Sequence, residues 1–310
     1  MARSVRLAAL SFQLGTAFVG RADRVDQAIR YIEGAADDGA DLVLLPEGFD
    51  LLQTVESRDV PSARDLEAYR TAQLDMAEPE NGPIAQRLQE TARSRQVIVV
   101  ANRTIREDDR LHNQATFIGR DGEIAGRYRK VQLTQNEFEI KGITPGEEIH
   151  PVEVEGVRYG VLVCQDMHFP EVAQIYALQG VDVLLNPTQA AGPTEELRYD
   201  MLRVRAHDAS VYLATSSFIQ GTRQSWNARL SRGTIVDYNG FVLADTGLRE
   251  GHVCATLGLD EERWTSWCTT DDHRRTIGRQ RRVDLYARYY KEIGQTKEMM
   301  IPRVEARVED

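Results

Sequence analysis

The sequence contains little cysteine and no long hydrophobic run. Its 310 residues include three cysteines, Cys164, Cys254 and Cys268, which are widely spaced and form no paired-cysteine motif. This pattern argues against a disulfide framework and indicates a reducing compartment. No segment is apolar over the length that a bilayer requires, and the first residues lack the apolar run of a signal peptide. We therefore expect a cytoplasmic protein with no membrane partner.

An excess of positive charge and a phosphate-binding loop are also missing. The formal net charge is −10, which argues against nucleic acid as a partner. The absence of a glycine-rich phosphate loop argues against nucleotide use. We predict structural roles and no metal site for the histidines that share no metal-ligand spacing, which are His112, His150, His207, His252 and His273.

Lysine is scarce among the basic residues. Lys130, Lys141, Lys291 and Lys297 are the only lysines among 38 Lys and Arg residues. A lysine kept in such an arginine-rich sequence is a candidate for a role that needs a compact ammonium with a tunable pKa. Chance is the alternative explanation.

What is present is the composition of an ordinary globular protein, with 42% hydrophobic and 28% charged residues. Strand and helix patterns alternate in both halves, and no linker rich in Pro, Gly or Ser separates them, so we predict one α/β domain. Hairpin signals at Arg120-Asp121-Gly122 and Asn239-Gly240 make the sheets mixed. The expected strands are 4–12, 41–45, 96–101, 113–119, 123–128, 157–163, 181–186, 211–216, 234–238 and 241–244, and the expected helices are 24–36, 84–95, 170–179 and 195–208.

Two segments fall outside this pattern. Residues 50–79 are polar, irregular and long, which is typical of a functional flap rather than a core element. The sequence from Gly278 onward is charged, and we expect it to be extended.

The most informative segment is Gly160-Val-Leu-Val-Cys164, which ends an apolar, β-branched run. Phe169-Pro170-Glu171 then opens a predicted helix, so Cys164 is expected in a sharp turn between a strand and a helix. Backbone amides and the helix dipole at such a turn can lower the pKa of a thiol and stabilise an oxyanion. Cys164 is therefore a candidate nucleophile, although most free cysteines are small buried hydrophobic residues.

Two further reactive side chains also follow predicted strands. Glu47 ends Leu42-Val-Leu-Leu-Pro-Glu47, and Lys130 ends Gly126-Arg-Tyr-Arg-Lys130. Sites in open α/β sheets gather beyond the carboxyl ends of the strands, so we expect Glu47, Lys130 and Cys164 to meet. A carboxylate, an ammonium and a thiol can act as base, oxyanion stabiliser and nucleophile.

This ordered set of residues resembles the nitrilase superfamily of carbon–nitrogen hydrolases, in which Glu, Lys and Cys are catalytic in that chain order. The resemblance covers roughly residues 4 to 288. It rests on Pro46-Glu47, Gly126-Arg-Tyr-Arg-Lys130 and Cys164-x-Asp166-x-x-Phe169-Pro170-Glu171, with support from Leu111-His-Asn113, Asp121-Gly122, Gly180-Val-Asp-Val-Leu-Leu-Asn-Pro187, Arg203-Val-Arg-Ala206 and Arg282-Val-Asp-Leu-Tyr286.

The resemblance implies an αββα sandwich of two mixed β-sheets covered by helices. The hydrolase domain would span 1–288, and a tail at 289–310 would dock on a neighbouring subunit or surface. A homodimer or larger homo-oligomer and the absence of a metal or organic cofactor are also implied. The implied reaction is hydrolysis of a small non-peptide amide or N-carbamoyl amine through a Cys164 thioester, with Glu47 as base and Lys130 as oxyanion stabiliser.

Relatives carry a second glutamate between the lysine and a Thr-Pro-Gly turn. By this resemblance the best match is Glu139, seven residues before Gly146 of Thr144-Pro-Gly146. Glu137 is its competitor, and a solvated loop charge is the alternative for both.

The predicted substrate-binding residues are Gln165, His168 and Gln189. The backbone N–H of Gln165 would share the oxyanion with Lys130. Relatives that bind a substrate carboxylate often have arginine where Met167 and His168 stand, which weakens the case for such a substrate. Many amidase relatives have histidine where Gln132 stands, and an aromatic residue is frequent at Gln165, so the detailed shape of the pocket is left open.

Other functions remain as alternatives. True nitrilases tend to carry glutamate where Asp166 stands, so amide hydrolysis is favoured over nitrile hydrolysis. An acyltransferase would use the same thioester with an amine in place of water, but such relatives usually carry membrane spans. A binding protein that has lost turnover would be expected to have lost Glu47, Lys130 or Cys164.

Overall fold

Two mixed β-sheets form the centre of the structure, a computed structural model that describes residues 3–13, 20–50, 63–189, 195–220, 229–230, 232–265 and 271–295. The strands hydrogen-bond in the order β5-β4-β3-β2-β1-β9-β8-β7-β6, and β9 contributes to both sheets. Parallel pairing joins β1, β2 and β3 in one sheet and β7, β8 and β9 in the other. The strands are β1 (Ser4–Gln13), β2 (Leu42–Leu44), β3 (Ile98–Glu107), β4 (Arg110–Ile118), β5 (Ile124–Arg129), β6 (Val152–Val154), β7 (Val157–Val161), β8 (Val183–Pro187), β9 (Tyr212–Gln220), β10 (Arg229–Leu230), β11 (Thr234–Val236), β12 (Val242–Asp245) and β13 (Gly251–Gly258).

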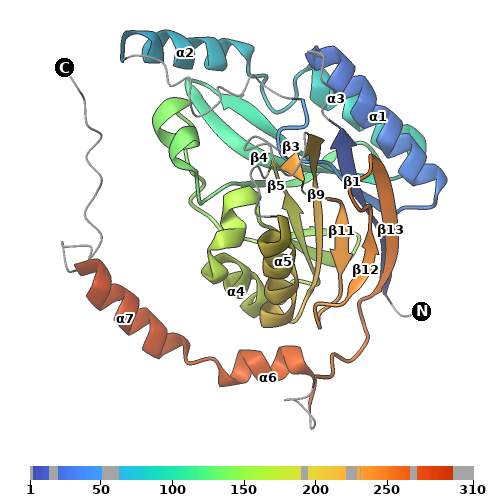
Figure 1. Ribbon diagram of the computed structural model, residues 1–310, viewed down its shortest axis with the longest axis vertical. Helices are drawn as coiled ribbons and strands as arrows, with labels where there is room; N and C mark the ends of the chain where they lie inside the picture. Colours follow the sequence, from blue (N-terminus) through green and yellow to red (C-terminus); the bar gives the residue numbers. More distant parts are fainter. Residues whose placement is uncertain are drawn as a thin grey trace.

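Helices cover the outer face of each sheet. Helices α1 and α3 lie on the first sheet, and α4 and α5 lie on the second (Figure 1). This layering confirms the predicted αββα sandwich. The helices are α1 (Arg21–Asp37), α2 (Ala63–Met76), α3 (Pro83–Arg95), α4 (Pro170–Leu178), α5 (Glu195–Ala209), α6 (His273–Gln280) and α7 (Val283–Gln295). No helix in the described ranges is long and apolar enough to span a membrane.

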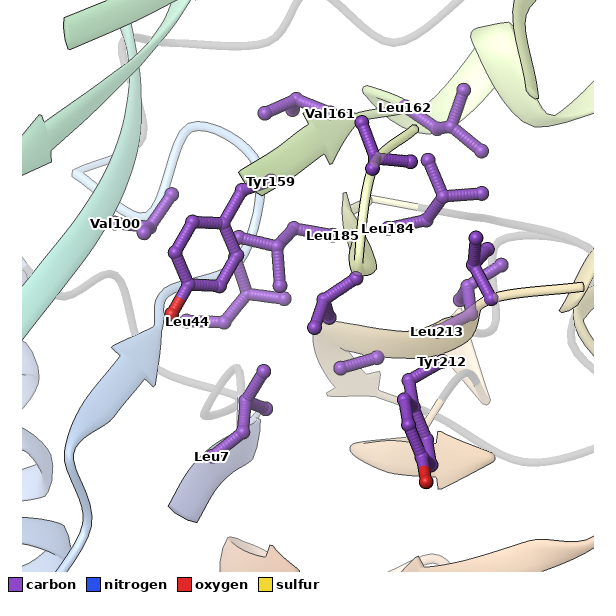
Figure 2. Close-up of a cluster of buried hydrophobic side chains, with 14 of the residues drawn as sticks. Leu7, Leu44, Val100, Tyr159, Val161, Leu162, Leu184, Leu185, Tyr212 and Leu213 are labelled. Atoms are coloured by element: carbon purple, nitrogen blue, oxygen red, sulfur yellow. The ribbon is translucent and has the colours of Figure 1, made fainter. Parts of the chain in front are cut away.

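The two-residue period of the strands divides their side chains between two hydrophobic clusters. In β2, Leu42 and Leu44 belong to the cluster that includes the second sheet, whereas Val43 packs with α1 and α3. Figure 2 shows Leu44 beside Tyr159 and Leu185 of the second sheet. Each such fully buried side chain contributes about 1.5–3 kcal/mol relative to an exposed one. This packing holds the ends of β2, β5 and β7 in fixed positions.

Both predicted hairpins are confirmed. Strands β4 and β5 pair antiparallel around Arg120-Asp121-Gly122, and β11 and β12 pair around Asn239-Gly240. Gly122 and Gly240 have φ values of 80° and 79°, which favour glycine at these turns. Strand β13, which the sequence analysis missed, pairs with β1.

Two predictions about irregular segments were wrong in part. Within residues 50–79, Ala63–Met76 forms α2, whereas 51–62 lie outside the described residues. The expected extended tail contains the end of α6 and all of α7. Helix α7 has Val283, Tyr286, Tyr290 and Ile293 at helical spacing. The predicted boundary at residue 288 falls inside this helix, and docking of the tail stays a prediction.

Candidate active site

Cys164 occupies the sharp turn that the sequence predicts. It follows β7 and begins a short 3₁₀ turn, Cys164–His168, after which Pro170 starts α4 at a position that favours proline. The φ angle of Cys164 is 44°, which is uncommon for a residue other than glycine and indicates local backbone strain. The strand, turn and helix therefore place the thiol at the end of the second sheet.

A buried carboxylate holds this turn. Asp166 accepts hydrogen bonds from the backbone N–H of Val163 (2.9 Å), the backbone N–H of Gln132 (2.9 Å) and the hydroxyl of Tyr128 (2.8 Å). Burial raises the pKa of Asp166 to about 7, while the charge of Lys130 and the three donors oppose the rise. These bonds tie the cysteine turn to the segment that follows Lys130.

Lys130 lies between two carboxylates. Its ammonium donates to Oε1 of Glu47 at 2.9 Å and to both carboxylate oxygens of Glu137, at 2.8 and 3.0 Å. Its side chain is only 1% exposed. Asn113 bridges the same two carboxylates with its amide, at 2.9 Å from Glu47 and 2.7 Å from Glu137. The two carboxylates thus hold the ammonium between them, and Asn113 holds the carboxylates together.

The buried charges stabilise one another in their ionised forms. Burial alone would lower the pKa of Lys130, but the charge of Glu47, that of Cys164 in its ionised form and that of Glu137 outweigh it and raise the pKa. Burial would raise the pKa of Glu137, but the charge and hydrogen bonds of Lys130 lower it. An ammonium and a carboxylate therefore persist in the interior at neutral pH.

The structure brings Cys164 to this cluster. Cys164, Glu47, Lys130 and Glu137 line one hollow of about 190 Å³, which we call the carboxylate hollow. Gln189 lines it too, and its backbone N–H donates to Oε2 of Glu47 at 2.9 Å. A thiol, a carboxylate and an ammonium can therefore reach the same small substrate.

The surroundings of Cys164 raise the pKa of its thiol, in contrast to the lowering that a turn between a strand and a helix can produce. Burial raises the pKa of Cys164 to about 11 and the charge of Glu47 adds to the rise, whereas Lys130 and a hydrogen bond with Thr188 oppose it. Helix and turn dipoles do not compensate for the loss of water around the sulfur. The thiol is therefore neutral in the resting protein, and a base must remove its proton.

We expect the Cys164 thiol to stay protonated through neutral pH. We compare the thiolate absorbance of the wild type with that of Cys164→Ala. The difference between them should be zero at neutral pH and should rise only as the pH approaches the pKa of about 11. A thiolate signal at neutral pH would show instead that Lys130 holds a resting ion pair with the sulfur.

The structure places Glu137, and not Glu139, in the cluster. Glu139 is exposed and accepts a hydrogen bond from the side chain of Gln135 at 2.8 Å. Glu137 accepts from the backbone N–H and the hydroxyl of Thr134, at 2.9 and 3.0 Å. Thr134-x-x-Glu137 is the pattern of a capping box. That signal, available in the sequence, ties Glu137 into the turn and leaves Glu139 on its outer side.

This difference predicts unequal effects for two otherwise matched variants. Glu137→Gln should lower kcat about 10²-fold, because a small misplacement of Lys130 is costly. Glu139→Gln removes the same charge from the protein surface and should change stability by less than about 0.5 kcal/mol and leave kcat unaltered. Steady-state kinetics on one amide compare the kcat values of the two variants, and melting curves compare their stabilities. Equal losses of activity would contradict the assignment.

The other predicted substrate-binding residues are distributed around Cys164. His168 is exposed and lines a second hollow that also contains Cys164. Burial, together with the charges of Arg198 and Arg205, lowers the pKa of His168. Gln165 is half-buried in the 3₁₀ turn and lines neither hollow. Sequence reasoning gave no role to Asn113, Thr188 or Arg198, whose importance depends on tertiary contacts.

Comparison with known proteins agrees with this arrangement. The family model described as "Carbon-nitrogen hydrolase" matches residues 11–268. The chain belongs to this family. It is a hydrolase of the nitrilase superfamily, in its amidase-type branch, that acts on carbon–nitrogen bonds other than peptide bonds. In the described part of the hydrolase, no group of three His, Cys, Asp or Glu side chains is arranged to hold a metal ion.

Similar proteins include enzymes from animals, plants and bacteria. The hydrolase is 30% identical over 293 residues to omega-amidase NIT2 of Homo sapiens, covering 92% of this chain and 97% of that protein. It is 30% identical over 273 residues to the chloroplastic omega-amidase of Arabidopsis thaliana, covering 84% and 69%. An amidase of Nesterenkonia shares the fold with a TM-score of 0.72 at 22% identity, covering 92% and 97%.

Proposed function

We propose that this hydrolase cleaves a small non-peptide amide or N-carbamoyl amine through a thioester on Cys164. The main observation in support is that Cys164 lines one hollow together with Glu47, Lys130 and Glu137. The similarity to omega-amidases over most of the chain supports an amide substrate. The size of the carboxylate hollow, about 190 Å³, supports a small one.

The first half of the reaction forms the thioester. Glu47 takes the proton of the Cys164 thiol as sulfur attacks the carbonyl carbon of the amide, because the thiol is neutral before substrate binds. The ammonium of Lys130 and the backbone N–H of Gln165 stabilise the oxyanion. Glu47 then gives its proton to the amide nitrogen, the carbon–nitrogen bond breaks, and ammonia leaves.

The second half restores the enzyme. Glu47 takes a proton from water, which attacks the thioester carbonyl, and the same oxyanion contacts act again. The carbon–sulfur bond breaks, Cys164 recovers a proton and the acid is released. Asn113 and Glu137 touch no reacting atom in this scheme. They position Lys130: its ammonium donates to Glu137, and the amide of Asn113 donates to both Glu137 and Glu47.

Ammonia release across aliphatic amides, ω-amides, N-carbamoyl amines, N-carbamoyl amino acids and nitriles tests the proposal. Turnover of an amide or carbamoyl class by the wild type would support it and select the substrate class. Turnover of nitriles alone would replace it with a nitrilase. If the folded protein releases no ammonia from any of these compounds but transfers an acyl group to an added amine, the proposed hydrolase would have to be replaced by an acyltransferase.

A further inference from the structure

Two successive residues after the strand β8 contact the nucleophile and the base. The hydroxyl of Thr188 hydrogen-bonds to the sulfur of Cys164, and the backbone N–H of Gln189 donates to Oε2 of Glu47 at 2.9 Å. Thr188 and Cys164 also line the second hollow, which has a volume of about 60 Å³. One short segment therefore contacts both groups between which the thiol proton must move.

Thr188 itself has little freedom to move. It is 5% exposed, and its backbone N–H donates to the carbonyl of Ser216 on β9 at 3.0 Å. Pro187, the residue before it, is paired with Ser216 in the parallel ladder of β8 and β9. Threonine is branched at Cβ, which restricts rotation of its side chain about χ1. The hydroxyl is thus presented to the sulfur in a nearly fixed position.

The two oxygens of Glu47 have different partners. Oε1 accepts hydrogen bonds from the ammonium of Lys130 and from the amide of Asn113, both at 2.9 Å. Among the described residues, Oε2 accepts one hydrogen bond, from the neutral N–H of Gln189. A cation lowers the basicity of the oxygen that it contacts. Oε2 is therefore the better proton acceptor of the two.

We propose that Thr188 is a further catalytic residue, whose hydroxyl donates to the sulfur of Cys164 and leaves the thiol proton free to pass to Oε2 of Glu47. This inference rests on the proposed function and adds a residue to it. A hydroxyl that accepted from the thiol instead would turn the proton away from Glu47. The donor role agrees with the electrostatics of the site, because the hydrogen bond of Thr188 opposes the rise in the thiol pKa that burial causes.

The hydrogen bond acts at both changes of charge on the sulfur. In the first half of the reaction, the S–H bond breaks, its proton moves to Oε2, and a sulfur electron pair forms the bond to the carbonyl carbon. Thr188 keeps its own proton, and its hydrogen bond is strongest while the sulfur carries negative charge. In the second half, the carbon–sulfur bond breaks and its electron pair returns to the sulfur. The same hydroxyl stabilises the departing thiolate until Glu47 returns a proton to it.

Replacing Thr188 by valine removes the hydroxyl and keeps the branched shape. In Thr188→Val, kcat and kcat/KM should fall together by roughly tenfold to 100-fold, which is the effect of one hydrogen bond to a charged group, with KM within about twofold. Thr188→Ser keeps the donor and should recover most of the activity. A Thr188→Val variant with the wild-type kcat would overturn the inference. So would a loss that appears only in KM, or a Thr188→Ser variant as impaired as Thr188→Val.

Thr234→Val is the matched control for the loss of a buried hydroxyl. Thr234 is 1% exposed and lines the same hollow, but its hydroxyl donates to Asp245 at 3.0 Å. The change should lower the melting temperature and leave the reactivity of the Cys164 thiol unaltered, because the sulfur keeps its donor. Equal losses of thiol reactivity in Thr188→Val and Thr234→Val would show a structural effect and overturn the inference.

Alkylation of Cys164 by iodoacetamide separates this inference from the proposed function, because it needs no amide turnover. Peptide mapping, with Cys164→Ala as the blank, isolates the rate at this one cysteine. At pH values well below the thiol pKa of about 11, Thr188→Val should slow the alkylation roughly threefold to tenfold. The smaller fraction of thiolate is partly offset by its greater nucleophilicity.

Slower alkylation in Thr188→Val but not in Thr234→Val would support the role of Thr188 even if no amide were hydrolysed. Amide turnover with equal alkylation rates in the wild type and Thr188→Val would leave the proposed function standing and overturn the role of Thr188.

Discussion

Replacing Cys164 by alanine is expected to reduce amide turnover by roughly 10⁴-fold or more, which is the scale of losing a covalent nucleophile. The variant should fold normally, because the change removes one atom from a half-buried side chain. Substrate binding should persist, since Glu47, Lys130 and Glu137 keep their mutual hydrogen bonds. Ammonia release and equilibrium binding of the same amide, measured side by side, test this result.

Cys254→Ala is the matched control. Cys254 is the other free cysteine in the described ranges, half-buried on β13 where it pairs with Ala8. Cys254 lines neither hollow, so its replacement should mainly affect stability and leave turnover within about twofold. Turnover that survives in Cys164→Ala, or that is lost equally in Cys254→Ala, would contradict the assignment of the nucleophile.

Replacing Lys130 by methionine is expected to lower the free energy of unfolding by about 3–5 kcal/mol, because it leaves buried carboxylates without their cation. Glu47 and Glu137 are 8% and 10% exposed in their side chains, so water cannot replace the ammonium. Urea titration of the variant and the wild type measures the loss. Lys291→Met, at an exposed position on α7, should cost little.

The size of this loss should depend on pH. In the wild type, the folded-state pKa of Glu137 is lowered, so its stabilising contribution is present above its unfolded pKa and disappears as the pH falls. In Lys130→Met, burial and repulsion from the Glu47 carboxylate should raise the pKa of Glu137 above its unfolded value. The variant should therefore be relatively more stable in acid and lose stability as the pH rises. A loss of equal size at neutral and acidic pH would contradict this account.

The sequence predicted those parts of the fold that depend on local pattern. Apolar runs located β2 and β7, and turn chemistry located the hairpin at Arg120-Asp121-Gly122. Local pattern also placed Glu47, Lys130 and Cys164 after strands, and the ordering of parallel strands brings such residues to one hollow. In α7 two local patterns conflict: the high charge indicates an extended tail, whereas the helical spacing of the apolar residues indicates the helix that forms.

The remaining features of the site depend on tertiary packing. The thiol pKa could not be predicted from the turn alone, because the burial that raises it comes from several elements. Arg198 is far from Cys164 in the sequence, and only the packing of α5 beside the cysteine turn brings it to the same hollow. Glu137 is an intermediate case, because its capping pattern with Thr134 is local but its contact with Lys130 is not.

The most direct test of the central claim is the mass of the protein during turnover. Wild-type enzyme mixed with a hydrolysed amide and quenched in acid should gain the mass of the acyl group, and peptide mapping should locate it on Cys164. Hydroxylamine should release the group, as expected for a thioester, and Cys164→Ala should gain no mass. Turnover without any acylated Cys164, under conditions in which the thioester would accumulate, would contradict the proposed chemistry.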